Sequence, residues 1–199
     1  MSKISLEPNA SGAGTFTLAA PNSDTNRTLT LPDASGSIVA ADASTGRFDS
    51  SNMPAGSVLQ VVQASTTTEV SLTSTSFQDS NLTGSITPSS ASSKILVIVS
   101  QGVRFDAFTN NRRDAFVRLL RNSTELFNRA SIVATSGTDS IGRWICMNTE
   151  SIVYLDSPST TSALTYKTQY RINNAANSTE LILQQLQSIS TITLMEIAG

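Results

Sequence analysis

Apolar and polar residues alternate along most of the chain from Ser57 onward, in short runs separated by turn residues. Alternation with a period of two is typical of a β-strand that buries one face. Ser57–Ala64 is the first such run, and Leu82–Thr87 alternates until Pro88 ends it. The same pattern predicts further strands over Glu69–Leu72, Phe77–Asp79, Lys94–Phe105, Ala115–Arg121, Glu125–Ala130, Arg143–Met147, Ser151–Asp156, Leu164–Asn173, Glu180–Gln185 and Ile189–Ile197.

One of these runs, Lys94–Phe105, contains the nearly continuous apolar segment Ile-Leu-Val-Ile-Val. Such a segment is typical of a strand that is covered on both faces. Residues 113–121 are compatible with a helix, but the asparagines at positions 110, 111 and 122 favour a strand with a hairpin turn after it. Eight to ten strands separated by turns predict an all-β, two-sheet sandwich, best matched by a jelly roll of the tumour-necrosis-factor-like kind.

Residues 15–39 show a weaker version of the same pattern, with three very short alternating strands. Their apolar positions are Phe16, Leu18, Leu29, Leu31 and Ile38. These strands are too thin to bury a core of their own, and an isolated ribbon is marginally stable in water. We therefore expect them to pair with other copies of the chain, which predicts a homotrimer with a slender N-terminal base.

The turn residues divide the chain into three parts. Residues 1–40 hold the short strands, residues 41–56 form a linker with turn chemistry throughout, and residues 57–199 form the sandwich domain. A length of 199 residues fits one globular domain preceded by an extension.

Composition supports the all-β interpretation. Serine and threonine together make 57 residues, while charged residues are only 14% of the chain. Threonine is favoured in strands and serine in turns. The net charge of −2 offers no electrostatic attraction for nucleic acid, and no apolar run approaches the length of a membrane span. We therefore expect neither nucleic-acid binding nor membrane insertion.

Catalytic and metal-binding motifs are not apparent. The chain contains no histidine, which excludes Ser-His-Asp and Cys-His sites and histidine-ligated metals. Its single cysteine, Cys146, excludes an intramolecular disulfide and is expected to be a small buried side chain. We expect a non-enzyme without cofactor or metal. The acidic residues, expected to be solvated, are Asp106, Asp114, Asp139, Glu150, Asp156 and Glu180.

Three segments carry a family resemblance. Thr28–Val39, with Thr-Leu-Thr-Leu-Pro-Asp at its start, resembles a segment that recurs in fibre and appendage proteins of tailed bacteriophages. Ala55–Val62 together with Ile86–Val99 is similar to the β-sandwich domain at the ends of such fibres, and Ile192–Gly199 is similar to its final strand. The resemblance implies a trimeric virion protein with an N-terminal anchor and a C-terminal head.

Three functions are compatible with this resemblance. In the first, residues 1–40 attach a tail fibre or appendage to other virion proteins, and the head binds a host-surface receptor such as a glycan. In the second, the protein is a capsid decoration or head-fibre protein that clamps capsid subunits. The third, a polysaccharide-degrading spike, has the least support. Since the N-terminus lacks the apolar region of a signal peptide, we expect synthesis in the host cytoplasm and a final location in the virion.

The candidate ligand contacts are Phe108, Arg112 and Arg113. Phe108 is expected in a loop over residues 106–111, where an exposed aromatic residue is a fair contact for a ligand. Arg112 and Arg113 belong to a basic cluster with Arg104, Arg118 and Arg121 that would suit an anionic glycan or an acidic virion partner. The alternative is that these arginines lie on ordinary solvated strand faces or form pairs between subunits with Asp106 or Asp114. The strand aromatics, Tyr166 and Tyr170 among them, are expected to pack in the core or at the trimer interface.

Overall fold

The computed structural model describes residues 11–12, 24, 53–108, 113–135, 143–175 and 179–199. Within the strands it describes no side chains for residues 108, 113, 130–135, 143 and 144. The chain divides into two compact units, Met1–Ile38 and Val39–Gly199, and all the strands described below belong to the second. The predicted short strands of residues 15–39 lie outside the described residues apart from Asp24, and the predicted domain boundaries stay a prediction.

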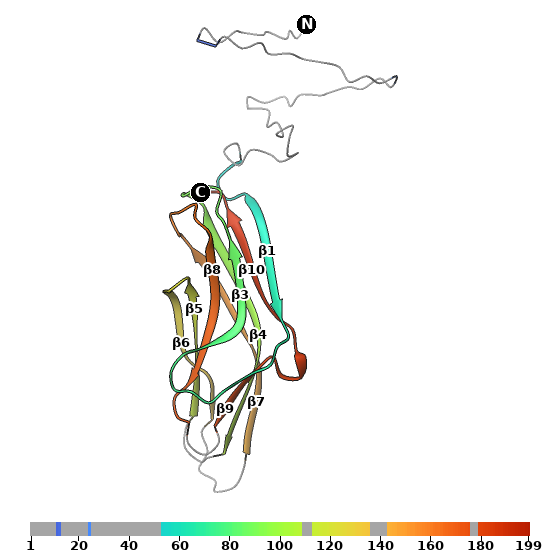
Figure 1. Cartoon of the computed structure of the whole chain (residues 1–199), viewed down its shortest axis with the longest axis vertical. Coiled ribbons are helices and arrows are strands. Elements are labelled where there is room, and N and C mark those ends of the chain that lie inside the picture. The colour runs from blue at the N-terminus through green and yellow to red at the C-terminus, as the bar shows by residue number, and fades with distance from the viewer. Residues whose placement is uncertain (1–10, 13–23, 25–52, 109–112, 136–142, 176–178) are drawn as a thin grey trace. The chain divides into compact units, whose positions relative to one another are not determined.

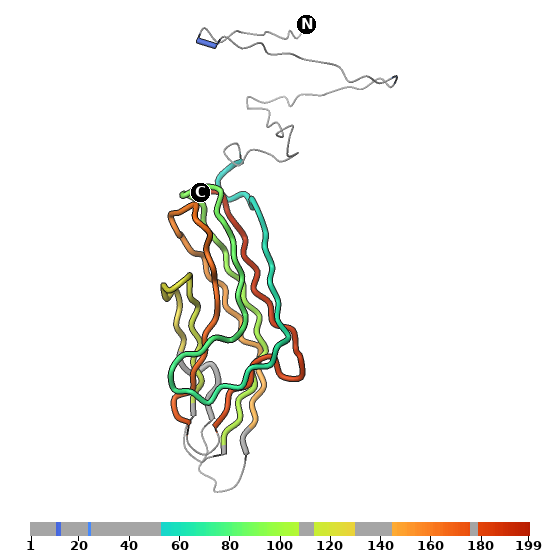
Figure 2. The backbone as a smooth tube through the Cα atoms, viewed as in Figure 1, coloured from blue at the N-terminus to red at the C-terminus, as the bar shows by residue number. Residues whose placement is uncertain are grey.

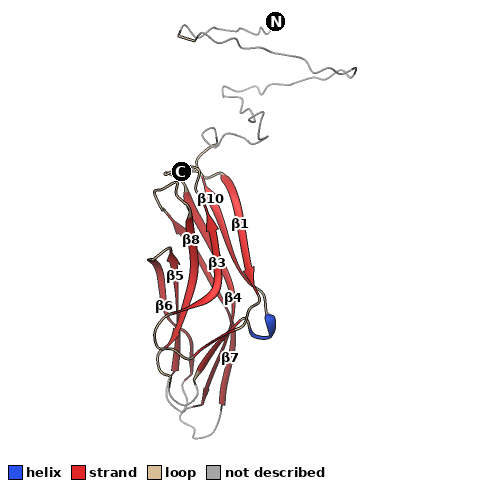
Figure 3. Ribbon diagram, in the orientation of Figure 1, coloured by secondary structure: helices blue, strands red, loops and turns tan. Residues whose placement is uncertain are grey.

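The second unit is built almost entirely from antiparallel β-strands (Figures 1 and 3). Its elements are β1 (Val58–Thr66), β2 (Val70–Leu72), β3 (Gln78–Ile86), β4 (Lys94–Phe108), β5 (Arg113–Arg121), β6 (Thr124–Thr135), β7 (Arg143–Asp156), β8 (Leu164–Ile172), β9 (Glu180–Leu183), the short 3₁₀ helix η2 (Gln185–Gln187) and β10 (Ser190–Ile197).

The strands form two sheets. In the first sheet the order is β1-β10-β4-β9-β2, with β7 paired to the other edge of β4, and in the second sheet it is β3-β8-β5-β6. Because β10 and β9 pair with successive parts of β4, they act as one interrupted strand, and β1 and β2 do the same beside them. Counted in this way, the described residues form eight strands in the orders 1-8-3-6 and 2-7-4-5, which is the jelly-roll arrangement. The predicted fold class is confirmed.

The core lies between the two sheets and follows from strict alternation along the strands. On β4, Ile95, Val97 and Val99 are completely buried, and β8 alternates buried and half-buried residues throughout. Tyr166 and Tyr170 of β8 are also completely buried, so their predicted packing in the core is confirmed.

Polar side chains join the sheets in the middle of this core. The carbonyl oxygen of the Gln101 side chain accepts hydrogen bonds from the Thr168 hydroxyl at 2.8 Å and the Tyr170 hydroxyl at 3.0 Å. Ser80 lies 2.6 Å from the same Thr168 hydroxyl, so three strands of the second and first sheets share one buried network. The hydroxyls and the Gln101 carbonyl oxygen are tolerated in the core because they hydrogen-bond to one another, whereas the Gln101 side-chain nitrogen is buried without a partner.

This network explains one error in the sequence prediction. Two strands were expected over residues 77–79 and 82–87, but β3 runs through both. The intervening Ser80 looks like a break in the sequence, yet it is completely buried because Thr168 satisfies its hydroxyl. A shift in register follows, with Asn81 in the left-handed region at φ 61°, so the strand continues through a bulge.

Two further strand predictions were wrong. The strands expected over residues 143–147 and 151–156 form the single strand β7, because Asn148, Thr149 and Glu150 stay in register with β4 despite their polarity. Residues 106–108 of the loop expected over 106–111 belong to β4, which continues to Phe108, and the rest of that loop lies outside the described residues. The strand, not the helix, was correct for residues 113–121.

The two ends of the sandwich differ in what they carry. At one end, here called the proximal end, the chain leading into β1 pairs with the C-terminal residues: the Gly56 amide donates to the Ala198 carbonyl and the Ala198 amide to the Ser57 carbonyl, both at 2.8 Å (Figure 2). At the opposite, distal end, the last residue of β4 pairs with the first residue of β7, and the first of β5 with the last of β6.

A buried carboxylate fastens the proximal end. Glu196 of β10 is completely buried, and it accepts hydrogen bonds from the backbone and the hydroxyl of Ser89, both at 2.7 Å. The Gln60 side-chain amide donates a third at 2.6 Å. One charged group, the Glu196 carboxylate, thus joins the loop between β3 and β4 to strands β1 and β10 of the first sheet.

Replacing Glu196 by glutamine should lower the free energy of unfolding by about 2 kcal/mol at about pH 7 and by much less at about pH 3. Burial by itself would raise the pKa of this carboxyl, but the hydrogen bonds from Ser89 and Gln60 outweigh it and lower the pKa. A lowered pKa means that Glu196 stabilises the fold above its unfolded pKa of about 4.3, and that this stabilisation is lost as the pH falls through the folded value. Denaturant titrations of both proteins across this range measure the difference.

Glu150 provides the matched control, because burial raises its pKa and the nearby Arg129 only partly opposes this. A raised pKa favours folding below the unfolded value, and that contribution is lost as the pH rises through the folded value. Relative to the natural chain, Glu150→Gln should therefore gain stability with rising pH, while Glu196→Gln loses it. The same pH trend in both variants would contradict these assignments.

Candidate interaction surfaces

Three rows of side chains cross the outer face of the first sheet, and none of their twelve residues is charged. In register through β1, β10, β4 and β7, the rows are Val61–Met195–Leu96–Leu155, Gln63–Thr193–Ile98–Val153 and Ser65–Thr191–Ser100–Ser151. Residues directly opposite each other in a sheet share a face, so each row is a continuous strip. The first strip is entirely apolar and the third carries only hydroxyls. These twelve residues are called the uncharged face below.

The uncharged face follows from the apolar segment of β4. Every second residue of that segment points into the core, while Leu96 and Ile98 point outward and stay partly exposed. Beside them on β7, Val153 is 67% exposed and Leu155 is 51% exposed. The prediction that β4 is covered on both faces therefore holds within one chain only for the inner face. Contiguous exposed apolar residues of this kind mark interaction sites.

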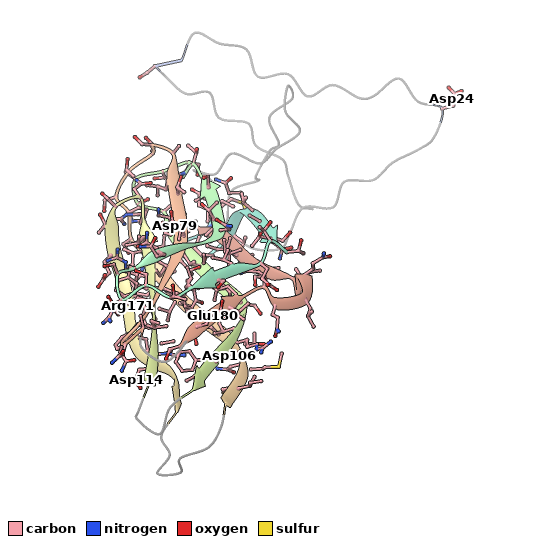
Figure 4. The ribbon with its side chains drawn as sticks, turned by 60° about the horizontal axis from the view of Figure 1, so that its bottom comes forward. Asp24, Asp79, Asp106, Asp114, Arg171 and Glu180 are labelled. Carbon is pink, nitrogen blue, oxygen red and sulfur yellow. The ribbon has the colours of Figure 1, made fainter. Side chains whose placement is uncertain are left out.

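The outer face of the second sheet is different, since it carries charged side chains, several of which form salt bridges. Lys167 of β8 lies 2.9 Å from Asp79 of β3, and Arg118 of β5 lies 3.1 Å from Glu125 of β6. Figure 4 shows Asp79 and Arg171 on this sheet. Exposed salt bridges contribute little to stability but suit a surface in contact with water. Of the two outer faces, the uncharged face of the first sheet is therefore the one that is poorly suited to contact with water.

Two arginines of the second sheet stack on aromatic rings. The Arg171 guanidinium carbon lies 3.8 Å from the ring centre of Phe116 and 5.2 Å from that of Phe77. Arg118 stacks on Phe77 at 4.3 Å. Such cation–π contacts hold the long arginine side chains flat against the sheet.

The described arginines of the predicted basic cluster do not gather into one site. Arg104 donates two hydrogen bonds to Asp106 on its own strand, at 2.8 and 2.7 Å. Arg121 binds the Asp156 carboxylate at 2.8 Å, and Arg118 belongs to the second sheet's outer face. These three side chains form ion pairs within the chain, and the pairing of Arg104 with Asp106 on the same strand differs from the expected pairing between subunits, which stays a prediction.

The candidate ligand contacts are placed only in part. Phe108 ends β4 and Arg113 begins β5, so both lie in strands at the distal end, and the predicted loop position of Phe108 was wrong. Their side chains and all of Arg112 lie outside the described part of the chain. Their ligand contacts stay a prediction. The predicted anchoring residues also lie outside it: Phe16, Leu18, Leu29, Leu31 and Ile38.

Acidic residues that were expected to be solvated are buried at four positions. Asp106 is 2%, Asp114 8%, Glu150 1% and Asp156 5% exposed. Ion pairs make this possible: Arg104 binds Asp106, Arg129 binds Glu150 and Arg121 binds Asp156. The burial of these three paired acids was not predicted from the sequence. Their arginine partners lie on other strands or within the same strand, where the local pattern does not indicate a pair. Asp139 lies outside the described residues.

Two of the acids are neighbours across strands, since Asp106 of β4 is the register partner of Glu180 of β9 (Figure 4). Arg104 neutralises Asp106, and the Ser71 hydroxyl of β2 hydrogen-bonds to Glu180. The Glu180 contact joins β2 to β9, while the Asp106 contact lies within β4. The position of Asp106 and Glu180 is explained by the contribution of these contacts to the stability of the first sheet.

A shallow groove of about 450 Å³ crosses the distal half of the first sheet's outer face, beside the connection between β9 and β10. Met147 forms an exposed apolar part of its wall, and the side-chain oxygen of Gln185 is buried there without a hydrogen-bond partner. Its lining consists of Gly102, Val103, Arg104, Met147, Asn148, Thr149, Gln185 and Ser188. In the part of the chain that the structure describes, no cluster of acidic or cysteine side chains is placed to hold a metal, and no helix is long and apolar enough to cross a membrane.

Comparison with known proteins gives only distant similarities. No protein-family model matches the chain, and no curated protein matches it. Among solved structures, it is similar to the VP2 protein of infectious bursal disease virus in a subviral particle, with 12% identity and a TM-score of 0.29 over 85% of this chain and 46% of VP2. VP2 in the T13 viral particle gives 9% identity and a TM-score of 0.33, over 81% of this chain and 40% of VP2. The chain spans less than half the length of these proteins, and so distant a likeness carries no argument about function.

Proposed function

We propose that this chain is a structural protein of a bacteriophage virion, a homotrimeric tail fibre or appendage protein with an N-terminal anchor and a C-terminal head. The observation that carries self-association is the uncharged face, where two apolar side chains of β7 are more than half exposed. A face without charge and with an apolar strip across four strands is suited to contact with another copy, because the chain itself covers only its inner side.

The layout of the sandwich supports a head on a stalk. The chain leads into the sandwich at the proximal end, where Gly56 is bonded to Ala198. The connections between β4 and β5 and between β6 and β7 leave from the distal end, as the register of these strands requires. The chain therefore enters the sandwich at the end opposite to the one that carries the ends of β4 and β5, which suits a fibre head.

The proposed mechanism is binding and not chemistry, without a cofactor or metal. Residues 1–40 would attach the trimer to other virion proteins, and Phe108, Arg112 and Arg113 would engage a host-surface glycan or protein. Three weak sites on one trimer, and several trimers on one particle, raise the apparent affinity by orders of magnitude. A capsid decoration protein would use the same trimer without a receptor.

Labelling virions with a gold-conjugated antibody against residues 57–199 separates these functions. Gold at the tail in electron micrographs is the expected result, and the isolated trimer should then bind host cells. Gold spread over the capsid would make the chain a decoration protein and remove the reason for a receptor site near Arg112. Clearing of host polysaccharide around spots of purified protein would contradict the non-enzymatic proposal.

A further inference from the structure

The exposed large apolar side chains of the described residues lie along two borders of the same sheet. On β1 and the β9–β10 connection beside it they are Val58, Val61, Leu186 and Ile189, and on β7 they are Ile145, Met147, Val153 and Leu155. Figure 3 shows η2 beside the end of β1. The Leu186 amide confirms this placement, since it donates to Glu69 in the connection between β1 and β2 at 3.1 Å. The two borders are named the β1 border and the β7 border below.

The two borders match in height along the strands. Val61 of the β1 border and Leu155 of the β7 border belong to the same row across the sheet. Further toward the distal end, the connection between β9 and β10 lies beside Gly102 of β4. Gly102 is the register partner of Thr149 on β7. Between the two levels lies the hydroxyl strip of Ser100 and its neighbours. Each border thus has a proximal and a distal apolar pair.

The distal pair of the β1 border is held out by a strained backbone. Gln184, Leu186 and Gln187 have φ angles of 54°, 52° and 60°, in the left-handed region that costs non-glycine residues about 1 kcal/mol or more each. Hydrogen bonds fix this shape, including one of 3.2 Å from the Gln184 amide to the Gly102 carbonyl. The result is a leucine that is 85% exposed and an isoleucine, Ile189, that is 70% exposed.

We propose that the β1 border of one copy packs against the β7 border of the next, so that the copies close into a head-to-tail ring. A rotation about an axis parallel to the strands preserves height, so proximal pairs meet proximal pairs and distal pairs meet distal pairs. Val58 and Val61 would contact Val153 and Leu155. Leu186 and Ile189 would contact Ile145 and Met147. Contact between two different surfaces that closes by rotation is a heterologous ring. The inference rests on the proposed self-association, which sets the number of copies at three.

Cysteine pairs in a Cys146→Ser background test this arrangement in the full-length chain. The matched-level variants are Val61→Cys with Leu155→Cys, Gln63→Cys with Val153→Cys, Leu186→Cys with Met147→Cys, and Ile189→Cys with Thr149→Cys. Val61 and Leu155 of one chain are three strand spacings apart, about 14 Å, which is too far for an internal disulfide. On mild oxidation, matched pairs should give covalent dimers and trimers on non-reducing gels.

Two controls make the result specific. Each single-cysteine variant should stay uncrosslinked, because in a heterologous ring a residue away from the rotation axis does not contact its own copy. The mismatched pair Val61→Cys with Met147→Cys should also stay uncrosslinked, because Met147 lies eight residues from Leu155 along β7, about 27 Å. Crosslinking of a single-cysteine variant, or of the mismatched pair, would overturn the ring.

Light scattering on the same samples separates this inference from the proposed function. A trimer in which none of the four matched pairs crosslinks would show that the copies meet through other surfaces, so that the ring is wrong while the trimer stands. A monomer would contradict the proposed self-association itself.

Discussion

Replacing Val153 and Leu155 together by glutamate should leave the sandwich folded and abolish its self-association. In the single chain both side chains are more than half exposed, so charges there cost the folded monomer little. In the assembled state the same charges would be buried without partners, at a cost of at least about 3 kcal/mol for each interface, which weakens association more than about 100-fold. Light scattering measures the mass, and circular dichroism measures the fold.

The matched control places the same charges on the second sheet. Thr83 and Ser85 of β3 are exposed, lie two residues apart and point to the outer face of that sheet. Thr83→Glu with Ser85→Glu should remain trimeric. The natural methionines report the same event, because Met147 should resist peroxide oxidation in the trimer and become reactive in the β7 variant. If the β7 variant kept its full mass, the uncharged face would not be the interface.

Replacing Arg121 by methionine should cost about 3 kcal/mol of unfolding free energy. Asp156 is 5% exposed, and Arg121 binds both of its carboxylate oxygens at 2.8 Å. The Tyr166 hydroxyl also donates to Asp156 at 2.7 Å, so this carboxylate joins β5 and β8 of one sheet to β7 of the other. Methionine keeps the apolar stem of the arginine but leaves a buried charge unpaired. Denaturant unfolding measures the change.

Arg118→Met is the control, since it makes the same substitution on the same strand at an exposed pair. The Arg118 side chain is 28% and the Glu125 side chain 41% exposed, so we expect a loss of about 1 kcal/mol or less. Adding Asp156→Asn to the Arg121→Met chain should recover part of the lost stability, because no buried charge is then left. Equal losses at both arginines would show that Asp156 is not energetically buried.

The strands could be predicted where one face is apolar and the other polar. β8 is such a case, since its alternation gives a buried residue at every second position, and its predicted and observed boundaries differ by one residue. The predictions failed where a polar residue is buried. Ser80 and Glu150 read as interruptions of β3 and β7, yet both point inward because Thr168 and Arg129 satisfy them. Those partners lie on other strands, so the local sequence pattern does not identify them.

One feature of the sequence indicated the uncharged face. The apolar segment of β4 predicts cover on both faces, and this is the same feature that leaves Leu96 and Ile98 partly exposed in one chain. The neighbours that extend the face could not be predicted, because Met195 and Leu155 join Leu96 only through strand pairings distant in the sequence. The strained β9–β10 connection has no sequence signal, since its left-handed residues are glutamine and leucine.

The most direct test of the central claim is the mass of the full-length protein in solution, measured by light scattering at micromolar concentration. Self-association through the uncharged face predicts three times the 21.0 kDa of one chain, unchanged by salt because no charged residue takes part in its three rows. A stable monomer at these concentrations would contradict it.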